Sequence, residues 1–477
     1  MRVFVTGATG FIGRALVARL LRDGHEVSAW VRSPAKAEGV LEAQVRRVPT
    51  RDEEALRSAV ASADAVVHLA GAPVAGKRWT ASYKQTLRRS RLQTTARIVD
   101  AIRASEGSRP RVLVSASAVG IYGDARREVD EDARAANDFL AQLCVDWEAA
   151  AAPARSLGVR VTHPRFGIVL GAEGGALAKM LPAFRAGTGG KLGDGRQGMS
   201  WVHIVDAVEA VMTALTDERF DDAFNVSAPS PVTNLAFTKA LGRALGRPTA
   251  LPVPAFALKA LFGEGAAPLL TGPLALPGRL RERGFVFAFG DLDDALRDIL
   301  SNDDVTIGPL SGAPPSHPYV DKRGATYELR AEVVVDAPLE RVFPFFSQAA
   351  NLGVLTPPHM AFGILRQDPD TMQTGTTIDY RIALGPIPMK WRTRIERFED
   401  GRGFVDSQLK GPYRSWYHEH WFEADGDRTR MLDRVYYKPP LGILGRIAHA
   451  LFIRGQLERI FGFRRQAVRF RFGCSAP

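Results

Sequence analysis

The sequence predicts an α/β domain with a doubly wound parallel sheet of the Rossmann type, followed by a smaller α+β domain. In residues 1–165, short β-branched runs alternate with longer helical stretches, which is typical of parallel strands joined by crossover helices. Near the C-terminus, strand-like segments follow one another with only short turns between them, as in antiparallel sheets. The chain length of 477 residues also exceeds the size at which one hydrophobic core stops growing, about 250–300 residues.

The first domain is expected to span residues 1–301. Its predicted strands are rich in β-branched residues and comprise Val3–Thr6, Val27–Val31, Ala65–Leu69, Val112–Ser115 and Val159–Thr162. From about residue 170 strands become sparse while Gly and Pro become frequent, so we assign residues 170–301 to a substrate lobe and a C-terminal extension. Residues 302–323 contain Gly308-Pro309 and Pro314-Pro315 without apolar periodicity, which predicts a linker.

The second domain is expected to span residues 324–477, with six strands and a long final helix. The predicted strands are Tyr327–Val335, Thr376–Ala383, Lys390–Phe398, Gly403–Leu409, Tyr417–Ala424 and Thr429–Tyr437, and the helix is Leu444–Phe470. Apolar residues recur near helical spacing on this helix and should face the sheet, leaving its arginines outside: Leu444, Ile447, Leu451, Leu457, Ile460 and Phe461.

Composition narrows the classes of function. The excess of 63 Lys and Arg over 52 Asp and Glu favours an anionic ligand only weakly, and no nucleic-acid partner is expected. Two isolated cysteines, Cys144 and Cys474, exclude a zinc framework of conventional spacing, so no metal site is predicted. They also fit a reducing compartment. With neither a signal-peptide pattern nor an apolar run of about 18 residues, we expect a cytoplasmic protein without a membrane span.

A glycine-rich turn follows the first strand and opens a helix. Gly7 allows the tight turn, Gly10 lets the backbone approach a pyrophosphate, and Gly13 permits close packing of helix on strand. The helix N-terminus adds free N–H groups and a positive dipole end. The sequence therefore predicts a dinucleotide site whose contacts are Thr6, Gly7, Thr9, Gly10, Phe11, Ile12 and Gly13.

The end of the second strand indicates which dinucleotide binds. Arg32 stands where an acidic residue would bind the ribose 2′-hydroxyl of NAD, and it can meet a 2′-phosphate instead. We therefore expect NADP rather than NAD. The alternative is that Arg32 is an exposed surface cation.

Several motifs resemble the extended short-chain dehydrogenase/reductase superfamily. They are the GxxGxxG spacing and the strand endings His68-Leu69-Ala70-Gly71 and Ser115-Ala116-Ser117. The runs Ser117–Asp124, Gly195–His203 and Pro231–Lys239 resemble its atypical branch of predicted nucleoside-diphosphate-sugar epimerases. This resemblance covers about residues 1–300. It implies an oxidoreductase or epimerase acting on a sugar nucleotide or carbonyl compound, with Leu69, Ala70 and Gly71 beside the cofactor.

The chain departs from the superfamily at the residues that transfer protons. That chemistry depends on a Tyr and a Lys four residues apart, because the Lys cation lowers the pKa of the tyrosine. Here the helical frame set by Glu148 places Leu140 and Cys144 at the two positions, and the adjacent frame places Phe139 and Leu143 there. The rival interpretation is therefore a non-catalytic NADP-binding sensor or scaffold, and a third is that NADP serves folding alone.

Other side chains are available if the domain is an enzyme. Ser117, just beyond the strand Val112–Ser115, is a candidate to bind a substrate oxygen, or else a turn-forming serine. Tyr122 is a candidate acid, or else a packing residue. Arg165, Trp201 and His203 fall where the superfamily builds its substrate wall, although His203 also fits a structural role.

The second domain carries a pattern resemblance. Glu332–Phe346 shows strand alternation, a break at Ala337-Pro338 and then a short helix. With the six-strand rhythm and the long final helix, it resembles the START-like (SRPBCC) helix-grip superfamily over residues 326–472. The resemblance implies a curved antiparallel sheet around the helix and a cavity for an apolar ligand. Aromatic residues that alternate along the strands either line that cavity or form plain sheet core: Trp391, Trp416, Tyr417, Trp421, Phe422, Tyr436 and Tyr437.

Overall fold

The computed structural model describes residues 1–301, 304–384 and 387–473. The chain divides into two compact units, which we call the N-terminal unit (residues 1–34 and 45–300) and the C-terminal unit (residues 35–44 and 301–477). Each unit has its own sheet. Among the described helices, none has the length and apolar character that crossing a membrane requires.

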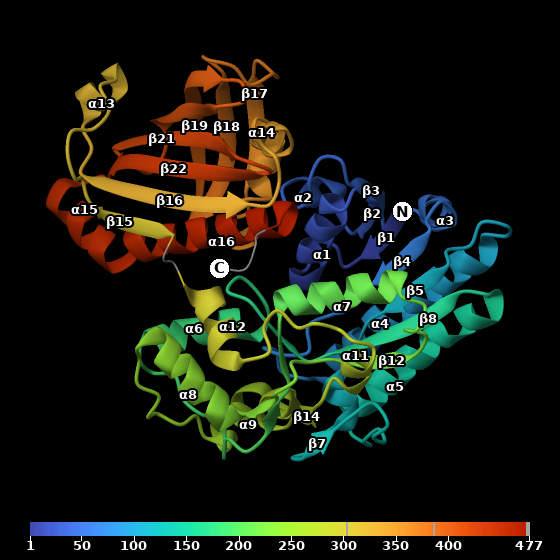
Figure 1. The fold of residues 1–477 in the computed structure, drawn as a ribbon. Helices are drawn as coiled ribbons and strands as arrows, with labels where there is room; N and C mark the ends of the chain where they lie inside the picture. Colours follow the sequence, from blue (N-terminus) through green and yellow to red (C-terminus); the bar gives the residue numbers. More distant parts are fainter. Residues whose placement is uncertain (302–303, 385–386, 474–477) are drawn as a thin grey trace. The chain divides into compact units, whose positions relative to one another are not determined.

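The N-terminal unit is built on a parallel sheet with the order β12-β8-β5-β4-β1-β2-β3, and β6 pairs with β8 (Figure 1). The strands are β1 Arg2–Thr6, β2 Glu26–Val31, β3 Arg46–Pro49, β4 Ala65–His68, β5 Val112–Ser115, β6 Ser117–Ala118, β8 Arg160–Phe166 and β12 Ala223–Val226. The order reverses between β1 and β4, so the chain makes the switch point at which α/β proteins bind ligands. The predicted doubly wound α/β sheet is confirmed.

Three of these strands were not predicted. β6 has only two residues, and each of the other two has a local reason. β3 reads Arg-Arg-Val-Pro and lies at the sheet edge, where its two arginines and its proline hide the strand signal. β12 contains Asn225 at its centre. That residue is fully buried, which the hydropathy of the segment does not indicate.

Helices cover both faces of this sheet. On one face, α3 and α4 pack with the strands around Leu56, Ile98 and Leu113. On the other, α1 packs with α7, which also contacts β5 and β8. The helices of this sandwich are α1 Phe11–Arg22, α3 Glu53–Ala61, α4 Ala81–Ala104, α5 Phe139–Ala151 and α7 Ile204–Thr216.

Segments of residues 170–300 form a lobe that packs around Trp201, together with Leu177, Phe237 and Leu296. Its helices are α6 Gly175–Arg185, α8 Asn234–Leu245, α9 Ala255–Phe262, α10 Ala267–Leu270, α11 Gly278–Glu282 and α12 Leu292–Leu300. Three short strand pairs form outside the main sheet: β9 Ile168–Leu170 with β11 Trp201–His203, β10 Gly198–Met199 with β13 Val232–Thr233, and β7 Glu128–Val129 with β14 Leu274–Ala275. A short helix, α2, spans Pro34–Glu38.

The C-terminal unit contains an antiparallel sheet of eight strands in the order β15-β16-β22-β21-β20-β19-β18-β17. The strands are β15 Val305–Pro309, β16 Tyr327–Val335, β17 Gly363–Asp368, β18 Thr377–Leu384, β19 Ile387–Glu399, β20 Gly403–Lys410, β21 Ser415–Asp425 and β22 Arg428–Lys438. The predicted antiparallel sheet is therefore present, with β15 and β17 in addition to the six expected strands.

Most of the segment predicted as a linker is structured. Residues 302 and 303 lie outside the described residues, but β15 pairs with β16 and buries Val305 and Ile307. The helix α13 (Pro318–Arg323) is fixed by the Tyr319 hydroxyl, which donates to the Gln408 carbonyl at 2.8 Å. The linker prediction was wrong here because Gly and Pro mark an edge strand and a helix start as readily as a flexible segment.

The final helix is shorter than predicted and begins later. After α14 (Leu339–Phe346), the C-terminal helices are α15 (Gly442–Ala448) and α16 (Arg454–Phe472), separated by a π-helical turn, η6, over His449–Ile453. Figure 1 shows α16 lying across the sheet, where Leu457, Phe461 and Val468 are buried.

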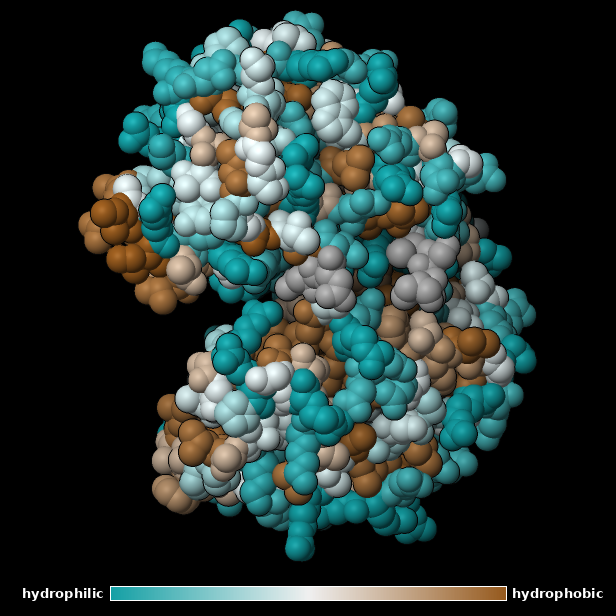
Figure 2. All heavy atoms as spheres, turned by 60° about the vertical axis from the view of Figure 1, so that its left-hand side comes forward, coloured by the Kyte–Doolittle hydropathy of each residue, from teal (hydrophilic) through white to brown (hydrophobic). Residues whose placement is uncertain are grey.

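Two expectations for this helix were wrong. Leu444, Ile447 and Leu451 are 52–67% exposed, since they precede α16, and Figure 2 shows an apolar patch over α15. Two arginines expected outside, Arg464 and Arg465, have side chains only 11% and 7% exposed. Acidic partners account for their burial: Arg464 pairs with Asp433, and Arg465 pairs with Asp304.

Candidate functional site

The glycine turn between β1 and α1 has the geometry that a dinucleotide requires. Gly7 has φ +73° and accepts a hydrogen bond from the Gly10 N–H at 2.8 Å. A Cβ at Gly13 would lie 2.1 Å from the Gly7 carbonyl oxygen, so only glycine lets the helix approach the turn this closely. Gly10 is the N-cap and has no side chain to occupy the first-turn N–H groups, which are available to a pyrophosphate.

A buried histidine holds the turn against the end of β4. His68 Nδ1 lies 2.6 Å from Thr6 Oγ1, and its Nε2 lies 3.0 Å from Thr95 Oγ1. Thr6 Oγ1 also accepts a hydrogen bond from the Ala70 N–H at 3.3 Å. Burial, with a smaller contribution from the nearby Arg91 charge, lowers the pKa of His68 to about 3, so the ring is neutral. This bridge places Leu69–Gly71 directly against the turn.

Arg32 lies where the sequence placed it, one residue beyond the end of β2. β2 pairs in parallel with β1, with Thr6 opposite Trp30, so Arg32 follows the carboxyl end of the strand next to the turn. Its side chain is exposed. An exposed cation at this position is accessible to a ribose 2′-phosphate.

A cavity of about 580 Å³ lies at the carboxyl edge of the sheet. Helix α5 contributes an apolar wall that includes both frames considered for the proton-transfer pair: Phe139, Leu140, Leu143 and Cys144. Burial raises the pKa of Cys144 to about 12, so this thiol stays protonated at neutral pH. The wall where the superfamily carries Tyr and Lys is therefore uncharged.

Behind this wall, Glu148 continues the helical stripe of Leu140 and Cys144 and joins two predicted site residues. Its Oε1 accepts from the Ser117 hydroxyl at 2.6 Å and from Arg165 Nε at 2.8 Å. Arg165 Nη2 donates to Oε2 at 2.9 Å, which completes a bidentate pair. Burial raises the pKa of Glu148, but the hydrogen bonds and charge of Arg165 outweigh it and hold the pKa below its usual value.

The same network contains Tyr122. Its hydroxyl accepts from Arg165 Nη1 at 2.9 Å and donates to Asn225 Oδ1 at 2.8 Å. Burial raises its pKa. The structure thus brings Ser117, Tyr122 and Arg165 together, but the residues that line the cavity do not include them. Sequence reasoning missed Asn225 altogether and used Glu148 only as a marker of the helical frame.

Trp201 and His203, predicted for the substrate wall, also lie away from the cavity lining. Trp201 is fully buried in the lobe, and its indole N–H donates to the Ser230 carbonyl. His203 caps α7 by accepting the Val205 N–H at Nδ1, and its Nε2 lies 3.3 Å from Asp298. Both side chains contribute to the packing of the lobe, because each is buried within it.

A different residue of the same loop reaches the cavity. The Gln197 amide N–H groups donate to the carbonyls of Leu192 and Leu269, while its Oε1 is buried without a partner among the described residues. Gln197 is 1% exposed and lines the cavity. Its carbonyl oxygen is thus a candidate acceptor for a ligand hydroxyl, and its only sequence signal is its place in the loop before Trp201.

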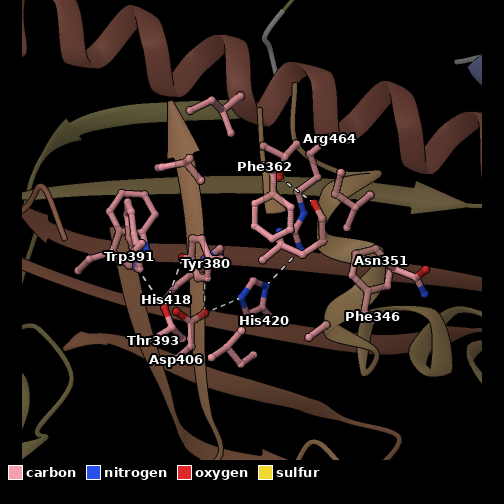
Figure 3. A pocket seen from close by; sticks show the side chains of 18 of the residues that line it. Phe346, Asn351, Phe362, Tyr380, Trp391, Thr393, Asp406, His418, His420 and Arg464 are labelled. Atoms are coloured by element: carbon pink, nitrogen blue, oxygen red, sulfur yellow. Dashed lines mark hydrogen bonds and ion pairs between the residues drawn. The ribbon is translucent and has the colours of Figure 1, made fainter. Parts of the chain in front are cut away.

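The C-terminal unit encloses a second cavity, of about 190 Å³ (Figure 3). Among the aromatic residues singled out, Trp391 and Trp416 line it. Tyr417 and Tyr436 lie in a separate cluster with Val320, as strand alternation requires. The lining is apolar except for a group of polar residues that includes Asp406, His418 and His420.

Fold and site together define the N-terminal unit as a nucleotide-binding protein of the extended short-chain dehydrogenase/reductase type. Residues 3–227 match the NAD dependent epimerase/dehydratase family, and residues 253–299 match a domain of unknown function, DUF1731. The chain is 44% identical over 303 residues to the epimerase family protein SDR39U1 homolog, chloroplastic, of Arabidopsis thaliana, covering 63% of this chain and 87% of the relative. The chain therefore belongs to this epimerase family, and the resemblance noted in the sequence is confirmed for the N-terminal unit.

Further relatives support this membership. The epimerase family protein ML0860 of Mycobacterium leprae is 42% identical over 297 residues, covering 62% of this chain and 94% of the relative. The crystal structure of human SDR39U1 (isoform 2) with NADPH superimposes with a TM-score of 0.56 and 34% identity, covering 63% of this chain and 99% of that chain. The structure of MoeE5 with UDP-glucuronic acid and NAD gives a TM-score of 0.51 and 25% identity, covering 62% of this chain and 96% of that chain.

Proposed function

We propose that the N-terminal unit is an NADP-dependent oxidoreductase or epimerase-like enzyme whose substrate, a carbonyl compound or a sugar nucleotide, binds in the 580 Å³ cavity. The observation that carries this proposal is the cavity itself, which lies at the carboxyl edge of a sheet whose first turn fits a dinucleotide. The exposed Arg32 supports NADP, as does the human relative crystallised with NADPH.

When bound, the nicotinamide supplies or accepts a hydride at its C4 carbon. The residues of this chain then bind and orient the substrate. The apolar wall of α5 excludes water, and Gln197 Oε1 accepts a hydrogen bond from a substrate hydroxyl. Ser117, our sequence-based candidate to bind a substrate oxygen, lies outside the lining of this cavity and donates its hydroxyl hydrogen to Glu148, so we propose a positioning role for it. Tyr122 and Arg165 act as positioning residues that hold α5 through Glu148.

The uncharged wall also supports the second candidate function, a non-catalytic NADP-binding sensor or scaffold. The superfamily's chemistry needs a proton donor at the position of Leu140 or Cys144. Neither of these side chains provides a readily ionised group. The two functions differ in turnover. An enzyme consumes NADPH in the presence of some carbonyl compound or sugar nucleotide, whereas a sensor binds NADPH without consuming it.

Calorimetric titration of the full chain with NADPH and with NADH tests the cofactor. We expect tighter NADPH binding, and we expect Arg32→Ser to weaken it about tenfold, or about 1.4 kcal/mol, with little effect on NADH. Arg57→Ser removes the same charge from an exposed position of α3 and should change neither affinity. Tighter binding of NADH by the wild type would contradict the NADP assignment.

NADPH absorbance measured with a panel of carbonyl compounds and sugar nucleotides then tests turnover. Gln197→Leu should raise KM for any substrate found, because the substrate hydroxyl loses its acceptor. The absence of NADPH consumption across the panel, together with tight binding, would favour the sensor.

We further propose that the C-terminal unit is a START-like ligand-binding domain fused to this enzyme. Its support is the apolar cavity between the sheet and α16, lined by Trp391, Trp416 and Phe461. The probe is 1-anilinonaphthalene-8-sulfonate, whose fluorescence rises in apolar sites. Ile460→Phe narrows the cavity and should reduce the signal, whereas Ile447→Phe makes the same change on exposed α15 and should not. An undiminished signal in Ile460→Phe would contradict this proposal.

A further inference from the structure

Four ionisable side chains lie close together on the inward face of the C-terminal sheet. Asp406, His418, His420 and Asp433 have side chains only 14%, 8%, 6% and 8% exposed. Aromatic rings pack beside them, among them Trp416 next to His418 and Phe404 next to His420. Because burying charged groups is costly unless they are paired or bind a metal, a cluster of this kind requires an explanation.

Strand register explains how these residues come together. Asp406 on β20 pairs directly with His418 on β21, and His420 pairs directly with Asp433 on β22. His418 and His420 are two residues apart, so both side chains point to the same face of the sheet. Figure 3 shows Asp406 and His420 pointing toward each other in the cavity, beneath the helix that carries Arg464.

The distances within the cluster match those of a metal site. Asp406 Oδ2 lies 3.0 Å from His420 Nε2 and 3.8 Å from His418 Nδ1. The three potential ligand atoms all lie within 4.8 Å of one another. Tetrahedral ligands about 2.1 Å from a zinc ion are separated by about 3.4 Å, which falls between the two measured distances.

Asp433 is placed to hydrogen-bond the two imidazoles rather than to bind the metal itself. Its Oδ1 lies 2.7 Å from His420 Nδ1 and 3.1 Å from His418 Nε2. By accepting N–H hydrogen bonds from both nitrogens, it selects the tautomers that leave His420 Nε2 and His418 Nδ1 free to bind a metal. Arg464 Nη2 lies 3.1 Å from the same oxygen and balances the charge of this carboxylate rather than that of Asp406.

We propose that Asp406, His418 and His420 bind one divalent first-row transition-metal ion, with Asp433 orienting both imidazoles. Two imidazoles and one carboxylate suit Zn²⁺ or Fe²⁺ and leave further coordination positions open. All three ligands line the cavity, so an open position is accessible to a molecule bound there. This proposal is independent of cofactor binding and turnover in the N-terminal unit.

The rival explanation is a closed network of hydrogen bonds in which His420 donates to Asp406 and Asp433. Such a network fills the ligand positions with protons and predicts no stoichiometric metal. Uptake of a metal ion by the folded protein therefore separates the two explanations.

The experiment uses the tag-free full chain, stripped with a chelator and titrated under anaerobic conditions with Zn²⁺, Fe²⁺ and Co²⁺ in separate samples. We expect one equivalent of metal per chain, and visible absorption bands when Co²⁺ binds. His418→Gln and His420→Gln should abolish stoichiometric binding. Asp433→Asn keeps all three ligands and should weaken binding about 10- to 100-fold. His317→Gln, an imidazole outside the cluster, is the matched control and should bind as the wild type does.

Two results would overturn the proposal. One is a folded wild type that takes up none of the three metals, a result that needs no variant. The other is a full equivalent of metal retained by the folded double variant His418→Gln/His420→Gln. Near-UV circular dichroism checks folding in each sample. The relative affinities for Zn²⁺ and Fe²⁺ then identify which ion the site prefers.

Discussion

Replacing Arg165 with Met tests whether the buried ion pair behind α5 holds that helix in place. The side chains of Arg165 and Glu148 are only 12% and 15% exposed. Met approximates the apolar stem of Arg but removes every donor, so Glu148 keeps only the Ser117 hydroxyl as a partner among those described above. The variant thus leaves a carboxylate buried without its counter-charge.

Breaking a buried pair in this way costs about 3–5 kcal/mol. Each kcal/mol lowers the melting temperature of a domain this large by about 2–4 °C, so we expect a drop of about 6–20 °C. The pH dependence follows from the pKa of Glu148. In the wild type that pKa lies below its usual value, so the pair's stabilisation is present above about pH 4.3 and is lost as pH falls through the folded pKa. In Arg165→Met the hydrogen bonds and charge of Arg165 are lost, so burial outweighs the remaining Ser117 hydrogen bond and raises the pKa of Glu148. The difference in stability between variant and wild type should therefore narrow in acid.

The assay is thermal and urea unfolding of the full chain by circular dichroism. The transition of the N-terminal unit is identified by its shift on adding NADPH. The double variant Glu148→Gln/Arg165→Met has no unpaired carboxylate, so its melting temperature should lie between those of Arg165→Met and the wild type. Arg243→Met breaks an exposed pair with Asp293, and this control should cost under about 1 kcal/mol. A cost for Arg165→Met no larger than this control would refute the reasoning.

Three further predictions concern the N-terminal unit. Gly13→Ala should abolish measurable NADPH binding in calorimetry, because its Cβ would meet the Gly7 carbonyl oxygen; unchanged affinity would show that the turn does not hold the pyrophosphate. The folded pKa of His68 lies near 3, below the unfolded value near 6.5, so its stabilisation is complete above pH 6.5 and is lost as pH falls. Between pH 6.5 and pH 5, unfolding experiments should show that the free energy of unfolding falls by about 1.6 kcal/mol, with a flatter profile in His68→Gln; equal slopes would contradict this account. Cys144, with a pKa raised to about 12, should react with a thiol reagent in the Cys474→Ser chain much more slowly at neutral pH than a free cysteine, because little of it is thiolate; labelling as fast as that of a free cysteine would contradict the raised pKa.

The features that were predicted correctly depend on local sequence. The dinucleotide turn needs glycines at three spacings between a strand and a helix, and all of that information lies within Thr6–Gly13. The parallel sheet follows from alternating strand and helix periods. Arg32 was placed correctly because it directly follows a clearly patterned strand. In each case neighbouring residues carry the physical cause.

Other features required contacts between distant residues. Glu148 joins Ser117 and Arg165, which lie 31 positions before it and 17 positions after it in the chain. Only the fold could show that Ser117 and Arg165 bind Glu148 and do not line the cavity. The exposure of Leu444 and Ile447 similarly depends on the π-helical turn, which helical periodicity does not reveal.

By itself, the sequence determined the two-part architecture, the nucleotide-binding turn and the absence of a Tyr and Lys pair on the helix that should carry it, because each depends on residues within a few turns of one another. Tertiary structure alone decided which polar groups meet. The cluster of Asp406, His418, His420 and Asp433 illustrates this, since the His418-x-His420 spacing does not reveal that Asp406 and Asp433 lie beside it. Strand register across β20, β21 and β22 brings these four side chains together, and register is set by the packing of the whole sheet.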